Sequence, residues 1–263
     1  MSEFHSTAII DRTVRVSSDV VIGPYVVIGP DSSIGPGSRI MHGAHIGPWT
    51  DLGANNLVYP GAIVGQDPQD LTFGGERSWL KIGDENTIRE GCTIHRGRGE
   101  DSSTVIGSHN YFMANSHVAH NCIIGERVIL VNGALLGGHC EVMNGAIVSG
   151  NCAVHQFVRI GRLAMMRGGS MASRDIPPFC VHDGQNRVRA LNLVGLKRNG
   201  FKPEDIRPLR EAFKIIFRSG KRLPQALDLV DEKFGKFPTV QEMLSFIRTS
   251  QRGICSGRRS ILS

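Results

Sequence analysis

The chain has 263 residues, of which 40% are hydrophobic and 6% aromatic, with 32 glycines and a net charge of +6. This length suits one large domain or two modest ones, and a core with so few rings must be filled by small and branched side chains. No stretch approaches the roughly 18 apolar residues of a membrane span, and the N-terminus lacks a signal-peptide pattern, so we expect a cytoplasmic protein without membrane insertion.

Charge and cysteine placement narrow the classes further. The six cysteines form no CxxC pair, so we predict neither a disulfide framework nor a zinc ribbon. Basic residues cluster at 187–189, 197–198, 214–222 and 258–259, which indicates an anionic partner, either a phosphate-bearing ligand or an acidic protein. Neither interleaved aromatic residues nor a recognition motif accompanies them, so we expect no nucleic acid partner.

From residue 10 to residue 166 an apolar residue recurs every six positions. The run starts at Ile10, Val16 and Ile22 and ends at Ile160 and Met166; 24 of its 27 positions hold a large apolar residue. Only Asp70, Glu76 and Glu100 interrupt it. Neither a helix nor a simple amphipathic strand has this period, which instead predicts a short strand and a corner, with three such repeats in each triangular coil.

Two further positions of the repeat support this prediction. Small or branched residues stand four places after the apolar one, and we expect them to point inward with it: Ser32, Ala44, Thr50, Cys92, Ser116, Cys122, Ala134, Cys140, Ala146 and Cys152. Glycine often follows the apolar residue directly, where we expect it to supply the positive φ of a sharp corner. These glycines are Gly23, Gly29, Gly35, Gly47, Gly53, Gly65, Gly83, Gly107, Gly125, Gly137 and Gly161.

Three segments depart from the repeat. Residues 66–78 and 97–104 read as loops that leave the coil, and the two prolines Pro177–Pro178 mark the predicted end of the rod. Helical periodicity follows at 206–219, 223–234 and 239–250. We therefore predict an all-β parallel β-helix domain over residues 1–187 and a small α-helical domain over residues 188–263.

Four histidines are predicted to converge on one outer face. His117 and His120 flank Val118, while His139 and His155 follow Leu136 and Val154. These three apolar residues are separated by three repeats each, so they stack in successive coils, and none of the four histidines occupies an inward position. Clustered imidazoles suit general-base catalysis, but three of them could also bind zinc. The other histidines considered, His5, His42, His45, His109 and His182, are expected to have no catalytic role.

The chain resembles the UDP-N-acetylglucosamine O-acyltransferases that open lipid A synthesis. The resemblance rests on HSTAII near the N-terminus, QDL at 69–71, TIHRG at 93–97, NSHVAHNC at 115–122, VHQF at 154–157, RDIPP at 174–178 and NLVGLKRNGF at 192–201. It implies a left-handed β-helix, a homotrimer with active sites between neighbouring rods, and transfer of a 3-hydroxyacyl chain from acyl carrier protein to the 3-hydroxyl of the sugar in UDP-N-acetylglucosamine. No cofactor and no metal are implied.

The same resemblance implies a set of roles for individual residues. His120 would be the general base, and the backbone N–H of Gly138 would face the developing oxyanion. His117, His139 and His155 would shape the sugar-nucleotide site. Gln156, Asn192 and Arg198 would reach the nucleotide and its phosphates. Gln69 and Asp70 would come from the loop, and Gly168 would lie where the acyl chain ends.

The sequence departs from the family pattern at four positions. Asn121 stands where Asp is usual, Thr72 where Lys is usual, and Val194 and Asn199 replace an acidic residue and an Arg. Three alternatives therefore accompany the main prediction: an N-acyltransferase acting on a UDP-3-amino sugar, a divergent non-catalytic nucleotide-binding relative, and a zinc enzyme of the carbonic anhydrase type on the same rod.

Overall fold

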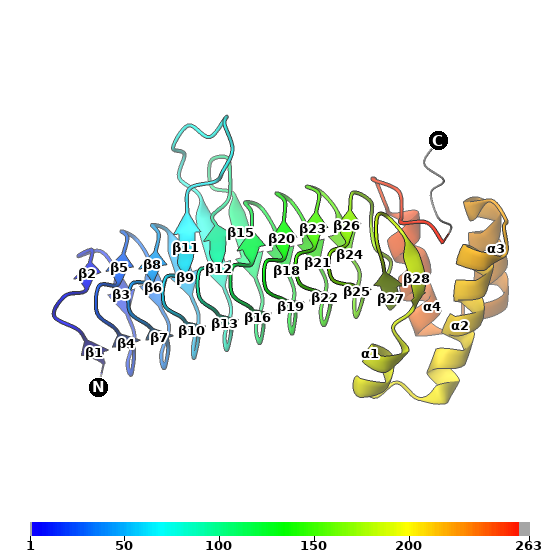
Figure 1. The fold of residues 1–263 in the computed structure, drawn as a ribbon, viewed down its shortest axis with the longest axis horizontal. Helices are drawn as coiled ribbons and strands as arrows, with labels where there is room; N and C mark the ends of the chain where they lie inside the picture. Colours follow the sequence, from blue (N-terminus) through cyan, green and yellow to red (C-terminus); the bar gives the residue numbers. More distant parts are fainter. Residues whose placement is uncertain (1, 258–263) are drawn as a thin grey trace.

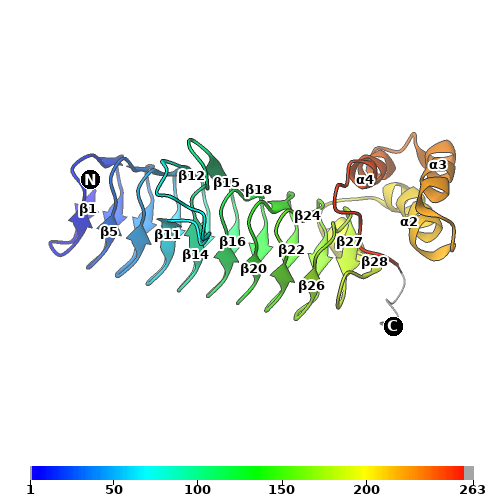
Figure 2. The ribbon, with the colours of Figure 1, turned by 90° about the horizontal axis from the view of Figure 1, so that it is seen from above.

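The computed structural model describes residues 2–257, so the basic pair Arg258–Arg259 lies outside the described residues. The chain winds into a long left-handed parallel β-helix with three sheets, and helices gather at one end (Figures 1 and 2). The predicted fold class is confirmed. Most strands are very short, because each triangular coil must also contain three corners.

The three sheets are named A, B and C. Sheet A contains β1 (Glu3–Phe4), β4 (Val21–Ile22), β7 (Arg39–Ile40), β10 (Leu57–Val58), β13 (Thr87–Ile88), β16 (Tyr111–Phe112), β19 (Ile129–Leu130), β22 (Ile147–Val148), β25 (Met165–Met166), β27 (Cys180–His182) and β28 (Val188–Leu191). Sheet B contains β2 (Ile9–Ile10), β5 (Val27–Ile28), β8 (His45–Ile46), β11 (Ile63–Gln66), β14 (Thr93–His95), β17 (His117–Val118), β20 (Leu135–Leu136), β23 (Ala153–Val154) and β26 (Met171–Ala172). Sheet C contains β3 (Arg15–Val16), β6 (Ser33–Ile34), β9 (Thr50–Leu52), β12 (Trp79–Ile82), β15 (Ser103–Ile106), β18 (Ile123–Ile124), β21 (Glu141–Val142) and β24 (Arg159–Ile160).

The six-residue repeat places its side chains as predicted. Every large apolar residue of the repeat from Ile22 to Met166 is buried, and so are all the small residues four places later. Ile10 and Val16 are only partly buried, because they lie near the open N-terminal end of the rod. All six cysteines are free and buried. The prediction that Cys92, Cys122, Cys140 and Cys152 pack in the core is therefore confirmed.

The predicted reason for the glycines was wrong. Of the eleven glycines that follow the apolar residue, only Gly65 has a positive φ. The others are needed because successive coils approach closely: a Cβ at Gly47 would lie 2.1 Å from the carbonyl oxygen of Gly65. The left-handed backbone falls two positions later, at Gly43 but also at Tyr25 and Leu163.

Both predicted loops leave the rod between sheets B and C. One joins β11 to β12 and the other joins β14 to β15, and the longer one projects from the rod (Figure 1). Arg96, which is 3% exposed, fixes the longer loop: its guanidinium is 2.7 Å from Asp67 and lies over the rings of Trp49 and Phe73, at 4.9 and 5.1 Å. The loop is thus held against the rod by a buried cation.

The rod does not end at the two prolines, and this prediction was wrong. After Pro177–Pro178, β27 still pairs in parallel with β25. The prolines sit in a corner, where no sheet hydrogen bond is needed from their nitrogens, and Gly161 leaves room for Pro178. The repeat also extends one step past each predicted limit, to Glu3–Phe4 and Met171–Ala172.

Four helices follow the rod: α1 (Leu193–Arg198), α2 (Pro203–Arg218), α3 (Leu223–Phe234) and α4 (Pro238–Arg248). The three predicted helices correspond to α2, α3 and α4, whereas α1 was not predicted. Since β28 pairs with β27, and Ile254 and Ser256 bridge back to Asp175 and Arg187, strand pairing crosses the predicted domain boundary at 187/188. That boundary stays a prediction. Within residues 2–257 no helix is long and apolar enough to cross a bilayer.

Candidate active site

The site lies at the corner between sheets B and C, below the longer loop. Three corner residues stacked in consecutive coils, Asn121, His139 and Phe157, all have left-handed backbone, with φ of 59°, 59° and 65°. The fold imposes this conformation, since Tyr25 and Leu163 adopt it at other corners. It turns the side chains of successive corners outward in one column. The ring of His139 stacks on Phe157 at 4.5 Å and meets His120 edge-on at 5.3 Å.

His120 is held in a defined tautomer. Its Nδ1 lies 2.8 Å from Asn121 Oδ1, and the backbone N–H of Arg98 donates to the same oxygen at 2.8 Å. Because the Arg98 N–H requires an acceptor, the atom at this position must be the amide oxygen of Asn121. An amide oxygen can only accept, so Nδ1 carries the ring proton and Nε2 has a free lone pair.

Gly138 lies directly against this ring. A Cβ at residue 138 would lie 2.7 Å from His120 Cε1 and 2.8 Å from Nε2, so only glycine leaves the space that the ring occupies. Among residues 2–257 the Gly138 N–H has no hydrogen-bond partner. A free backbone donor beside a free imidazole nitrogen is the pair of groups that acyl transfer requires.

The longer loop covers the ring from the other side. Asp70 Oδ2 lies 3.8 Å from His120 Nε2 and 3.4 Å from Arg98 Nε. Hydrogen bonds from the Thr72 hydroxyl and amide, followed by the charges of Arg98 and His120, hold the pKa of Asp70 below its usual value. His120 was expected to be an outward-facing residue, and it does lie outside the core, but the loop leaves it only 8% exposed.

A fifth histidine belongs to the cluster and was missed from the sequence. His95 is buried, its ring lies 5.2 Å from His117, and its Nδ1 contacts the backbone oxygen of Asp67. Ile94 pairs with Val118, four repeats later instead of three, because the shorter loop lengthens this coil. A search at intervals of three repeats therefore passes over His95, whereas allowing for the loop would have found it.

The cluster remains uncharged at neutral pH. Burial, helped by His95 and His120, lowers the pKa of His117 to about 4, and burial also lowers the pKa of His95 and His139. His117 Nδ1 lies 2.8 Å from the Thr93 hydroxyl. The rings of His95, His117 and His139 are thus neutral groups able to hydrogen-bond a polar ligand.

The remaining predicted residues are spread more widely. His155 is exposed and its Nδ1 meets only the backbone oxygen of Gln156, itself exposed, so His155 makes no ring contact with the other histidines. Gln69 is exposed on the loop and Gly168 is exposed at a different corner, between sheets A and B.

The two predicted residues around α1 differ in how free they are. Asn192 is buried, accepts from the Gly195 N–H and donates to the Leu163 oxygen, so both of its polar atoms are engaged. Arg198 is exposed, and its guanidinium pairs with no carboxylate in the described part of the chain. Figure 1 shows α1 on the opposite side of the rod from the loop above His120.

A groove of about 560 Å³ opens beside the histidine corner. Asn121, His139 and Phe157 line one side of it, and Thr249 and Arg252 from the C-terminal segment line the other. No group of three or more His, Cys, Asp or Glu side chains within residues 2–257 is arranged to hold a metal ion. The groove can therefore receive part of a substrate next to the free nitrogen of His120.

Comparison with known proteins gives consistent matches along the chain. Residues 103–138 match the family model described as bacterial transferase hexapeptide (six repeats), and residues 175–255 match that of UDP N-acetylglucosamine O-acyltransferase, domain 2. The acyl-(acyl-carrier-protein)–UDP-N-acetylglucosamine O-acyltransferase of Halorhodospira halophila is 45% identical over 97% of this chain and 99% of its own length. The enzyme of the same name from Thermodesulfovibrio yellowstonii is 43% identical, over 97% and 100%. The solved structure of UDP-N-acetylglucosamine acyltransferase from Francisella novicida superposes with a TM-score of 0.93 at 34% identity, covering 97% of this chain and 94% of that one.

Proposed function

The chain belongs to the UDP-N-acetylglucosamine O-acyltransferase family, and from this we propose that it transfers a 3-hydroxyacyl chain from acyl carrier protein to the 3-hydroxyl of UDP-N-acetylglucosamine. This reaction is the first step of lipid A synthesis. The observation that carries the proposal is the single His120 ring, with its Nδ1 proton held by Asn121 and its free Nε2 beside the unpartnered Gly138 N–H. A sugar hydroxyl is a poor nucleophile, and this pair of groups supplies the missing base and oxyanion donor.

The chemistry follows from these two groups. His120 Nε2 takes the proton of the sugar 3-hydroxyl as its oxygen attacks the thioester carbonyl, forming a tetrahedral intermediate. The Gly138 N–H donates to the oxygen that becomes negative. The intermediate then collapses, the carbon–sulfur bond breaks, and the imidazolium returns its proton to the leaving thiolate. A neutral ring and a free thiol remain, together with the new ester.

We assign the other residues around this centre. His117, His139 and His155 shape the sugar-nucleotide site, and Gln69 and Asp70 approach it from the loop. Gln156, Asn192 and Arg198 reach the nucleotide and its phosphates. Gly168 marks the end of the acyl chain, where only a residue without a side chain leaves the space open.

The protein is proposed to work as a homotrimer. The outer face of sheet B carries exposed apolar side chains that a partner would cover, among them Ile63, Leu135 and Met171, at 38%, 47% and 54% exposure. Arg198 on α1 and His120 below the loop lie on opposite sides of one rod, so a site that uses both needs a second copy. Three rods around one axis would place a loop of each beside the helices of its neighbour.

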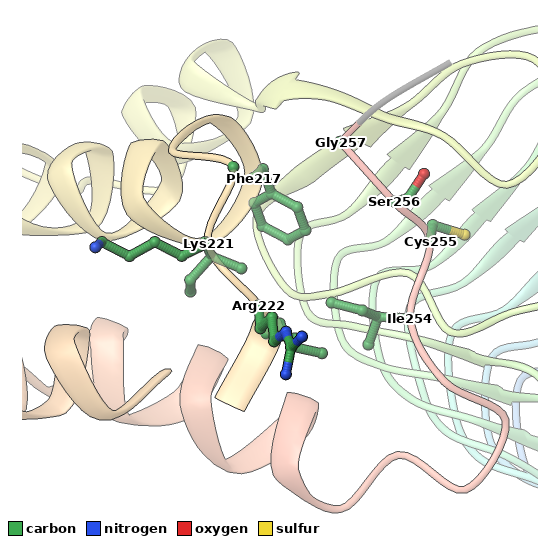
Figure 3. A pocket seen from close by; sticks show the side chains of 10 residues that line it. Phe217, Lys221, Arg222, Ile254, Cys255, Ser256 and Gly257 are labelled. Carbon is green, nitrogen blue, oxygen red and sulfur yellow. The ribbon is translucent and has the colours of Figure 1, made fainter. Parts of the chain in front are cut away.

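The helical end is proposed to receive acyl carrier protein in the cytoplasm. A pocket of about 340 Å³ lies where α2 meets the C-terminal segment, with Phe217 and Ile254 among its apolar lining residues (Figure 3). Lys221 and Arg222 line the same pocket, and neither pairs with a carboxylate among residues 2–257. Free cations around an apolar pocket suit an acidic protein partner.

Product analysis tests the function. The protein is incubated with UDP-N-acetylglucosamine and a panel of 3-hydroxyacyl carrier protein thioesters, and the nucleotide sugar is weighed by mass spectrometry. We expect one acyl group to be added, with a loss of about 10² to 10⁴ in rate for His120→Ala. Absence of product with every thioester would refute the function, and product only with the 3-amino sugar would establish the N-acyltransferase alternative.

A further inference from the structure

Arg98 contacts both residues that flank the ring of His120. Its backbone N–H donates to Asn121 Oδ1 at 2.8 Å, and that oxygen holds the Nδ1 side of the ring. Its side chain reaches the Nε2 side, where Nε is 3.4 Å from Asp70 Oδ2 and the terminal nitrogen donates to the Thr72 hydroxyl. One residue of the shorter loop thus links the rod, the longer loop and the candidate base.

Asp70 is fixed by these contacts in one orientation. Its Oδ1 accepts from the Thr72 amide at 2.8 Å and from the Thr72 hydroxyl at 2.6 Å. Its Oδ2 is left facing Arg98 and, at 3.8 Å, His120 Nε2. The carboxylate therefore stands on the side of the ring where the proton arrives, whereas the neighbour on the Nδ1 side is a neutral amide.

We propose that Arg98 is a positioning residue for the transfer reaction: it holds the Asp70 carboxylate beside His120 Nε2, and this carboxylate balances the charge that the ring gains with the proton. The inference rests on the proposed function, because it assigns His120 as the base. Asp70 takes over the compensation that Asn121, being uncharged, cannot give. Without the guanidinium, Asp70 keeps its two bonds to Thr72 but loses the contact that directs Oδ2 toward the ring.

Arg77 offers a matched control. It joins the same two loops through Asp101, at 2.7 Å, and its guanidinium is half exposed and contacts neither His120 nor Asp70. Arg98→Ala keeps the backbone N–H that holds Asn121, so it removes only the guanidinium. If Arg98 merely tied the loops together, Arg98→Ala and Arg77→Ala would have similar effects.

The experiment compares wild type, Arg77→Ala, Arg98→Ala and the double variant Arg98→Ala/Thr72→Lys. A lysine at position 72 would bring a cation to Asp70 from the side of its own loop. We expect Arg98→Ala to lower kcat about ten- to a hundredfold, as displacement of a group by about 1 Å can, with unchanged KM values and thermal midpoint. Arg77→Ala should keep the wild-type kcat, and the double variant should recover most of the loss.

A spectroscopic readout separates this inference from the function itself. In protein with ¹³C-labelled histidine, the Cε1–Hε1 signal of His120 should move in Arg98→Ala, return in the double variant and stay in place in Arg77→Ala. If wild type forms no acyl product while the signal behaves in this way, the proposed function fails and the positioning stands. Equal effects of Arg77→Ala and Arg98→Ala, a rise in KM with kcat intact, or no recovery by Thr72→Lys would each overturn the positioning role.

Discussion

Gly138 shows how a single hydrogen atom can decide the position of a catalytic ring. A methyl group at residue 138 would overlap the Cε1 and Nε2 atoms of His120, at 2.7 and 2.8 Å, and would push the ring out of reach of the substrate. We predict that Gly138→Ala lowers kcat about a hundredfold and leaves the thermal midpoint nearly unchanged.

The matched control is Gly150→Ala. Gly150 occupies the same position two residues after the apolar one, and its nearest neighbour would be the Asn132 oxygen at 3.3 Å. Steady-state kinetics of both variants should show the loss in Gly138→Ala alone. Full activity of Gly138→Ala would mean that the ring is not held at this place during turnover.

Asn121 offers a second prediction at the scale of one residue. An aspartate would accept the same two hydrogen bonds, from His120 Nδ1 and the Arg98 N–H, and would add a negative charge that favours the protonated ring. We expect Asn121→Asp to shift the acid limb of the pH–rate profile to higher pH and to raise the plateau rate with the hydroxyl acceptor.

Paired pH–rate profiles on hydroxyl and 3-amino acceptors test this. The backbone should tolerate the change, since aspartate is among the residues that adopt left-handed φ most readily and Asp31 already does so here. An acid limb that does not move would show that residue 121 fails to couple to the base.

At the scale of the coil, two kinds of glycine have different physical reasons. Gly43 has a φ of 65° with nothing within 4 Å of an added Cβ, while a Cβ at Gly47 would lie 2.1 Å from a backbone oxygen of the next coil. We predict that Gly43→Ala costs about 1 kcal/mol of stability through backbone strain, and that Gly47→Ala costs about 3 kcal/mol or more through overlap. Thermal unfolding of the two variants measures the order.

The result bears directly on how the repeat should be interpreted. If Gly43→Ala were the more damaging substitution, then φ rather than coil spacing would explain the glycines. Tyr25 and Leu163 already argue for the opposite, because bulky residues occupy the left-handed corner position, whereas a bulky residue at the Gly47 position has no space.

At the scale of the whole molecule, buried histidines make the rod sensitive to acid. His182 is fully buried near the end of the rod, and neither ring nitrogen has a partner among residues 2–257. Burial lowers the pKa of His182 to about 4, as it does that of His117. Between pH 6.5 and about 4 the unfolded chain binds protons that the folded chain refuses, so the free energy of unfolding falls as the pH falls.

Each of these two histidines should contribute a loss on the order of 3 kcal/mol across that window. We predict that His182→Leu raises the thermal midpoint at pH 5 more than at pH 7.5, because it removes both the unpartnered nitrogens and the acid-linked loss. Thermal scans at the two pH values measure the difference. An equal gain at both values would show that protonation of His182 plays no part.

The sequence alone determined the rod, the inward side chains, the loops and three of the four helices. It could do so because these features repeat at a fixed period or follow local rules of helix termination, so each residue reports its own position. The histidine column was partly accessible in the same way, since His117, His120 and His139 keep the spacing of the coil.

Only the tertiary structure decided what surrounds the base. His95 joins His117 across a loop that lengthens the coil from three repeats to four, and Asp70 and Arg98 meet His120 from two loops outside the repeat. The spacing between coils, which gives Gly47 and Gly138 their meaning, is likewise a distance between backbones far apart in the chain. A periodic pattern records which way a side chain points, but contacts between coils depend on loop lengths and backbone separation, which no period encodes.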